Sequence, residues 1–489
     1  MTDYAFTQKP VTVPKVKSKF RRIVTPIPSP RSIPVLKKLS RYEPQSLHHE
    51  LPVVWDHASD FQVFDASGNC WIDFTSGIFA TNTGHSPPEI CRALTRQLNQ
   101  KLLHNYVFPS QVRAQLAQKI IAMSPLPLNK VFFLSSGSEA SECALKLMRL
   151  HGHQLRQRKN ILVCFDGSFH GRTLGAQMMS GKPAGKKWIR HIDPDIYHLP
   201  FPYCQKCPWG RPGYEKCGAW CFKKGIRHLK EKNINLDQVA GFMIESYQGW
   251  GAIFYPKDYI QALRLWADQH QCLVTFDEIQ SGFARTGRLF AYQHYHVKAD
   301  LVVCGKGLSG GLPMSAVLGR ASILDRAPDL SSTHTGNPVC CAAALANLEI
   351  IKKHNLAKKA HDSGKILLSQ LNKIKHKYPN VINLILGKGL LYALHIVSPN
   401  PDEPKNAARA GTMQKWAQKR GTKTCPVSQT KELDVLLGDR IIEKAMQKGL
   451  LMVRTSSGTI KIAPPLTITS EALVEGASVL EEAIKECVS

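Results

Sequence analysis

The sequence predicts an α/β protein with a large domain built on a mostly parallel β-sheet and a smaller α+β domain. Through the middle of the chain, short apolar segments rich in Val, Ile and Phe alternate with helical segments. This alternation is typical of a parallel sheet covered by helices on both faces. Beyond about residue 345 the spacing becomes irregular, which indicates a second lobe. The length of 489 residues also favours two lobes over one core.

We expect four regions along the chain: an extended arm over residues 1–50, the first part of the small domain over 51–95, the large domain over 96–345, and the rest of the small domain over 346–489. The first 45 residues contain seven prolines and ten Lys and Arg residues. Prolines interrupt helices and strands, so this stretch is expected to lie extended.

The hydrophobic pattern assigns the individual elements. A hairpin is expected at Phe61–Phe64 and Cys70–Phe74, around the turn residues 65–68. Helices are expected at Pro88–Leu103, Val112–Met123, Glu139–Leu150, Tyr259–His270, Cys340–His354, Ala360–Lys375 and Arg440–Lys448. Strands are expected at Val131–Leu134, Ile161–Phe165, Val239–Ile244, Leu273–Phe276, Leu301–Cys304, near Gly389–His395 and at Thr459–Ile462. The polar stretch 398–432 is expected to be a long loop.

Composition narrows the classes of function. The formal net charge is +27, but no helix-turn-helix, RRM or basic-zipper pattern accompanies it, so a basic surface is expected and a nucleic-acid partner is not. No apolar run reaches the length of a membrane-spanning helix, and the first residues lack the apolar core of a secretory signal. We therefore expect a cytoplasmic protein whose fourteen cysteines are reduced thiols; a mitochondrial presequence is the alternative for the basic N-terminus.

Three segments carry residues suited to chemistry, each after a predicted strand. Ser135-Ser136-Gly137-Ser138-Glu139 begins a helix, where free N–H groups and the helix dipole can hold a phosphate. Asp277 and Lys306 end two other strands. Singly, each has an ordinary explanation: a helix cap, a turn cap, an exposed loop lysine. Together, a phosphate site, an acid and a lysine nucleophile are the protein groups that pyridoxal phosphate (PLP) requires.

The chain resembles the class III, or omega-type, PLP-dependent aminotransferases of fold type I, which include ornithine, acetylornithine and 4-aminobutyrate aminotransferases. The resemblance runs from about Arg22 to the C-terminus. It rests on six blocks in order: Asp73-Phe74-Thr75-Ser76-Gly77 with Gly84-His85, Ser136-Gly137-Ser138-Glu139-Ala140, Ser168-Phe169-His170-Gly171-Arg172-Thr173, Asp277-Glu278-Ile279-Gln280-Ser281-Gly282-Phe283, Gly305-Lys306-Gly307, and Gly336-Asn337-Pro338.

The resemblance implies a role for each matching residue. Lys306 would form the Schiff base and shuttle the proton, and Asp277 would pair with the pyridine nitrogen. Gln280 would reach the ring hydroxyl, and Phe169 would stack on the ring. The remaining cofactor residues implied are Ser136, Gly137 and Ser138 at the phosphate, His170 in the Phe169 block, and Thr333, which would reach the phosphate of a partner subunit, with Thr335 as a second choice. The active unit would then be a homodimer or a dimer of dimers.

Departures from the family pattern bear on the substrate. Many relatives have a glutamate in a Gln-Gly-Glu-Gly sequence that pairs with a C-terminal arginine and switches between amine and dicarboxylate substrates. Here Trp250 takes the place of the glutamate, and Lys461 takes that of the arginine. Lys461 can hold a carboxylate only as a point charge, and Arg172 is a second carboxylate candidate or a surface residue. Further pocket candidates are Ile78, Phe79 and Tyr106.

The resemblance implies transfer of an amino group between an amine or amino acid and a 2-oxo acid. The alternative is an amino acid or lactam racemase or epimerase on the same fold, which would use Lys306 and Asp277 but return the proton to Cα.

Four cysteines are clustered in an insertion placed at residues 200–225. Cys204, Cys207, Cys217 and Cys221 follow a spacing that suits a four-thiolate metal site, with zinc as the first choice. Reduced thiols in a loop are the alternative.

Overall fold

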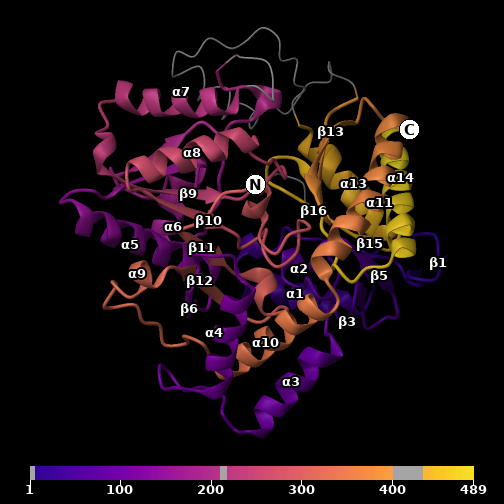
Figure 1. The fold of residues 1–489 in the computed structure, drawn as a ribbon. Helices are drawn as coiled ribbons and strands as arrows, with labels where there is room; N and C mark the ends of the chain where they lie inside the picture. The colour runs from indigo at the N-terminus through magenta and orange to yellow at the C-terminus, as the bar shows by residue number, and fades with distance from the viewer. Residues whose placement is uncertain (1–5, 210–216, 400–432) are drawn as a thin grey trace.

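The computed structural model describes residues 6–209, 217–399 and 433–489. Its largest sheet has seven strands in the order β6-β12-β11-β10-β9-β7-β8 (Figure 1). The pairings make β12 the one strand that runs against the other six. The strands are β6 Lys130–Leu134, β12 Ser315–Gly319, β11 Leu301–Cys304, β10 Leu273–Asp277, β9 Val239–Glu245, β7 Ile161–Phe165 and β8 Ile196–Leu199. The expected α/β class is confirmed.

Both faces of this sheet are buried, and alternate residues of one strand enter different cores. In β7, Ile161, Val163 and Phe165 join one hydrophobic cluster, whereas Leu162 and Cys164 join another. This period of two follows from strand geometry. Helix α5, Gly137–Leu155, supplies its apolar face to the second cluster, and α8, Lys257–Gln269, supplies its own to the first. The two helices therefore cover opposite faces.

Shorter or more peripheral helices complete the large lobe. Helix α10 packs against α3 and α4, and α7 lies along α8 (Figure 1). Their bounds are α3 Pro88–Asn99, α4 Gln111–Met123, α6 Leu174–Met179, α7 Gly218–Glu231, α9 Ala321–Leu324 and α10 Pro338–Lys353.

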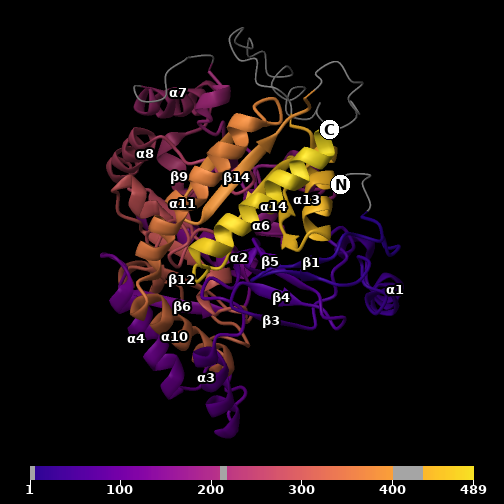
Figure 2. The same ribbon diagram turned by 90° about the vertical axis from the view of Figure 1, so that its right-hand side faces the viewer.

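Two small sheets flank the large one. One has the order β1-β2-β5-β4-β3 with β15 beside β5, and the other has the order β13-β14-β17-β16. Helices α11 and α14 pack against each other beside the second of these sheets (Figure 2). The bounds are β1 Val16–Lys17, β2 Arg22–Ile23, β3 His57–Ser59, β4 Gln62–Phe64, β5 Cys70–Asp73, β13 Ile382–Lys388, β14 Leu391–Ile396, β15 Leu450–Leu451, β16 Val453–Arg454, β17 Thr459–Ile462, α11 Leu356–Lys377, α13 Val435–Gln447 and α14 Ser470–Val488.

The expected hairpin is confirmed as β4 and β5, and β7, β11 and β17 have the expected bounds. The expectation that residues 1–50 form only an extended arm is wrong. Ser32–Tyr42 is a helix, α1, whose proline stands in the first turn, where the missing N–H costs no hydrogen bond. Ile23 and Ile27 are also buried, against Trp71 among others. The expected loop at 398–432 lies almost entirely outside the described residues.

Within the described part of the chain, none of the helices combines the length and the apolar character needed to cross a membrane.

Gly152 offers a test of the packing between α5 and the sheet. A Cβ there would lie 2.1 Å from the Lys159 carbonyl oxygen and 2.8 Å from Ala240 Cβ. Although alanine normally favours a helix, we expect Gly152→Ala to lower the free energy of unfolding by about 1–3 kcal/mol, as overpacking does. Gly225→Ala in α7 is the control, because its nearest neighbour would be 3.5 Å away. Equal melting temperatures for the two variants would contradict the packing argument.

Candidate functional site

The site begins where three neighbouring parallel strands end. Asp277, the last residue of β10, is in register with Glu245 at the end of β9 and with Val303 of β11. Lys306 follows β11 by two residues. Because parallel strands end at one edge of a sheet, two carboxylates and an amine are brought together there, as α/β folds generally do at ligand sites.

The Asp277 carboxylate is buried and held from two sides. Its Oδ2 lies 2.8 Å from His170 Nδ1, and its Oδ1 accepts the Ile279 N–H at 3.1 Å. The backbone N–H of His170 donates to Ser180 Oγ at 2.9 Å. The imidazole thus orients the carboxylate. His170 Nε2 is buried and has no partner among the described residues.

Lys306 has a left-handed backbone conformation and is followed by a glycine that has no room for a side chain. Its own φ is +41°, and a Cβ on Gly307 would lie 2.4 Å from Asn82 Nδ2. Burial lowers the pKa of the Lys306 amine, although the nearby Asp277 and Glu245 carboxylates partly oppose this. A lowered pKa increases the neutral fraction of the amine, which is the form that attacks a carbonyl.

The start of α5 presents two unused N–H groups. Ser136 and Glu139 form a capping box, so the Ser136 hydroxyl accepts the Glu139 N–H and the Glu139 carboxylate accepts the N–H groups of Ser135 and Ser136. The N–H groups of Gly137 and Ser138 have no acceptor within the described residues. They stand at the positive end of a 19-residue helix, which suits a phosphate.

Phe169 and Arg172 lie beside this helix start. The Phe169 side chain is 47% exposed, and its backbone N–H donates to Glu245 Oε2 at 3.1 Å. The Arg172 guanidinium stands 5.8 Å from the Phe169 ring centre, and its backbone N–H donates to Ser138 Oγ at 3.2 Å. A ring face is therefore available next to the phosphate position, with a cation at its side.

Gln280 is fixed by two donors, one from each lobe. Its Oε1 accepts from Lys461 Nζ at 2.6 Å and from the Tyr247 hydroxyl at 3.1 Å. Because the oxygen is occupied by donors, the amide NH₂ is left to donate elsewhere. Lys461 also donates to the Gly249 carbonyl at 2.7 Å and lies 4.2 Å from the Phe79 ring centre. Burial lowers the pKa of Lys461 to about 7. Lys461 therefore contacts both Gln280 and Gly249 in this structure.

Trp250 is held in place by neighbours from several segments. Its Nε1 donates to Gln248 Oε1 at 2.7 Å, and its ring centre lies 6.2 Å from that of Tyr203 and 5.8 Å from that of His395. Its carbonyl accepts the Thr459 hydroxyl. The indole is a fixed, partly buried wall.

The other sequence-predicted residues differ in exposure. Ile78 and Tyr106 are exposed, and Thr333 is exposed as well, as a contact to a second subunit would need. Thr335 is buried and donates to the Phe133 carbonyl at 3.1 Å. Its hydroxyl is used within the chain, so Thr333 is the better phosphate candidate of the two.

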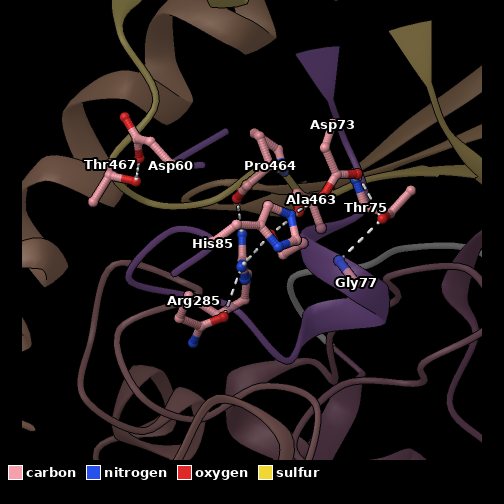
Figure 3. A network of polar contacts seen from close by, with 11 residues as sticks. Asp60, Asp73, Thr75, Gly77, His85, Arg285, Ala463, Pro464 and Thr467 are labelled. Carbon is pink, nitrogen blue, oxygen red and sulfur yellow. Dashed lines mark hydrogen bonds and ion pairs between the residues drawn. The ribbon is translucent and has the colours of Figure 1, made fainter. Parts of the chain in front are cut away.

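Sequence reasoning missed Arg285, a fully buried cation. It donates to the carbonyl oxygens of Leu390 and Pro464, to Ser76 Oγ at 3.0 Å and to Asn82 Oδ1 at 2.7 Å (Figure 3). Burial lowers its pKa to about 10. The sequence did contain a signal for it, because Arg285 directly follows the small and apolar residues 281–284.

Glu245 was also missed, although it ends a predicted strand as Asp277 does. It is buried between the Phe169 and Gly249 N–H groups, and burial raises its pKa to about 7. The nearby His170 lowers this pKa and the Asp277 carboxylate raises it. No motif around Glu245 marks this carboxyl group as one that is buried beside the lysine.

Comparison with known proteins agrees with this geometry. The family model "Aminotransferase class-III" matches residues 44–484. The chain belongs to the class-III aminotransferases. It is 31% identical to an ornithine aminotransferase of Emericella nidulans, over 90% of this chain and 87% of the relative. It is 30% identical to a leucine/methionine racemase of Thermococcus litoralis, over 92% and 95%. Among solved structures, a PLP-bound amine transaminase from an uncultivated Pseudomonas species is 26% identical, covers 89% of this chain and 95% of its own, and has a TM-score of 0.77.

The cofactor of this family is PLP, and the residues at the strand ends fit it. Asp277 suits a pyridine N–H, the free N–H groups of Gly137 and Ser138 suit a phosphate, and the exposed Phe169 face suits an aromatic ring. This aminotransferase therefore has the groups its cofactor needs in one place.

The hold of Lys461 on Gln280 can be tested by Lys461→Met, which keeps most of the volume but removes the donor. We expect kcat/KM to fall by roughly ten- to a hundredfold, because a hydrogen bond from a charged group contributes about 1.5–3 kcal/mol. Steady-state kinetics and a PLP titration provide the measurement. Lys359→Met is the control, since Lys359 is a part-buried lysine that donates to the Thr467 carbonyl away from the site. Wild-type kinetics and PLP affinity in Lys461→Met would show that Gln280 needs no such hold.

Proposed function

We propose that this aminotransferase uses Lys306 as both the cofactor-binding amine and the proton carrier, with Asp277 as the partner of the pyridine nitrogen. The observation that carries the proposal is the lowered pKa of a buried Lys306 beside Asp277 at adjacent strand ends. When bound, PLP supplies an electrophilic carbonyl carbon and a protonated ring that accepts the electron pair released when a substrate Cα–H bond breaks.

Residues of this chain would bind the cofactor and transfer the proton. Asp277, oriented by His170, would keep a pyridine nitrogen protonated. The Gly137 and Ser138 N–H groups would hold the phosphate, and the Gln280 NH₂, fixed by Lys461 and Tyr247, would donate to the ring hydroxyl. Lys306 would take the Cα proton and return it to the cofactor carbon.

The active unit in this proposal is a homodimer or a dimer of dimers in the cytoplasm. The exposure of Thr333 supports it, because this hydroxyl is free to reach the phosphate in a second subunit. Such a contact would make each site depend on its partner.

The amino donor in this proposal has an apolar or bulky body. Trp250 presents a flat wall where a glutamate would accept an arginine, and Lys461 is occupied by Gln280 and Gly249. A lysine also lacks the planar fork that grips a carboxylate. Arg172, exposed beside the Phe169 ring, is then the residue best placed to hold a substrate carboxylate.

A second candidate is racemisation of an amino acid or lactam, in which the proton returns to Cα from the opposite face. The likeness to a leucine/methionine racemase favours it, as does the replacement of the glutamate–arginine pair. A racemase forms the D-amino acid from the L-form without a 2-oxo acid, whereas an aminotransferase needs one. Chiral chromatography with and without the acceptor separates the two functions.

Lys306→Ala tests the proposal directly. We expect a folded protein whose turnover falls by at least about a thousandfold, because a covalent catalyst and proton carrier is lost. Turnover is measured with the best donor found for wild type. Lys298→Ala, an exposed lysine shortly before β11, should retain wild-type turnover. Activity of Lys306→Ala within about tenfold of wild type would refute the assignment.

The choice of acceptor tests the role of Trp250 and Lys461. We expect pyruvate or another small oxo acid to give a higher kcat/KM than 2-oxoglutarate. Trp250→Glu combined with Lys461→Arg should raise 2-oxoglutarate use, since it restores an acceptor and a bidentate donor. If wild type already works best with 2-oxoglutarate, another group must hold the second carboxylate, and Arg172 is the first to examine.

A further inference from the structure

Four cysteines between β8 and α8 lie around one small cavity. The cavity measures about 10 Å³ and is lined by Cys204, Cys207, Cys217 and Cys221. Its remaining lining comes from Pro202, Tyr203, Pro208, Gly218 and Pro256. A volume of this size is about that of one small ion or water, and the polar groups around it are thiols.

The local backbone brings the cysteines in as two pairs. Cys204 begins a 3-10 turn over Cys204–Lys206, and Cys207 follows it directly. Cys217 precedes α7, and Cys221 lies one turn later, with its N–H donating to the Cys217 carbonyl at 2.7 Å. A spacing of four places both side chains on one face of the helix. Each pair can therefore offer two sulfurs to a common centre.

The four thiols are close enough to interact electrostatically. Cys217, Cys221 and Cys207 all lie close enough to Cys204 to act on its thiol electrostatically. No disulfide joins any two of these four described cysteines. Within residues 6–209, 217–399 and 433–489, no three His, Cys, Asp or Glu side chains lie close enough together to hold a metal ion as they stand. To bind an ion, the four sulfur atoms would have to move closer to one another around the cavity.

We propose that Cys204, Cys207, Cys217 and Cys221 bind one Zn²⁺ ion as four thiolates. Soft thiolate donors in two pairs select zinc in tetrahedral coordination. Binding deprotonates the four thiols and releases their protons to solvent. With four protein ligands the ion has no open position, so the site is structural and takes no part in turnover. The inference stands apart from the proposed function, because none of these cysteines is among the residues proposed to hold PLP.

The ion would stiffen one wall of the substrate region. Tyr203 adjoins Cys204 and meets Trp250 edge-on at 6.2 Å between ring centres. On the other side, Asp258 of α8 accepts the Ala219 N–H at 3.1 Å, and a Cβ on Gly218 would lie 2.0 Å from its Oδ1. The cluster thus joins the start of α7, α8 and the Trp250 wall.

The test is the metal content of the holoenzyme, purified without chelators from zinc-supplemented culture. We expect about one zinc per chain by mass spectrometry. Cys204→Ser with Cys217→Ser, which removes one ligand from each pair, should lower the zinc content by roughly tenfold or more. Cys91→Ser is the control, because Cys91 is exposed and lies outside the cluster. It should retain the wild-type zinc content.

A second measurement serves if the double variant does not fold. Titration of the wild-type holoenzyme with a mercurial thiol reagent should release its zinc, followed with a chromogenic chelator, as the cluster thiols react. Absence of zinc in wild type, or equal zinc in the double variant, would overturn the proposal. One iron per chain in place of zinc would overturn the choice of metal. The PLP content of the same samples reports separately on the cofactor site.

Discussion

The buried guanidinium of Arg285 is the constraint on which the rest of the site depends. It forms no salt bridge with a carboxylate among the described residues, and its hydrogen bonds instead go to three other segments, at Ser76 and Asn82, at Leu390, and at Pro464. Figure 3 shows its contact with Pro464. A buried charge is costly unless its donors are paired. Nη1 and Nη2 of Arg285 each donate two hydrogen bonds, whereas Nε has no partner among the described residues. The arrangement of the lobes that makes these hydrogen bonds also places Asn82 against Gly307, next to Lys306 in the chain.

The site is correspondingly shared between the lobes. The large sheet supplies Asp277 and Lys306 from adjacent strand ends, but the orientation of Gln280 comes from Lys461 on β17 of a small sheet. A change in the docking of the lobes would thus alter the position of Gln280 without changing any residue of the large sheet.

The sequence was sufficient for the residues whose position follows from a strand end. Asp277 and Lys306 were predicted because apolar runs mark where β10 and β11 stop. It was insufficient for residues defined by long-range contacts: Lys461 was expected to meet substrate, yet its partner Gln280 lies 181 residues away. Strand β12 was not predicted because its small residues do not favour a strand strongly. Helix α1 was not predicted because the prolines around it argued against a helix, although its apolar residues have helical spacing.

The segment α2, Ser76–Phe79, has φ values of +51°, +55°, +61° and +70°, so it is a turn of left-handed backbone in which three of the four residues are not glycine. Such a turn costs about 1–2 kcal/mol for each non-glycine residue and cannot form from local preference. It is held by Asp73, through Thr75, and by Arg285 from the other lobe. Ile78 and Phe79 should therefore reach their places only when the lobes dock.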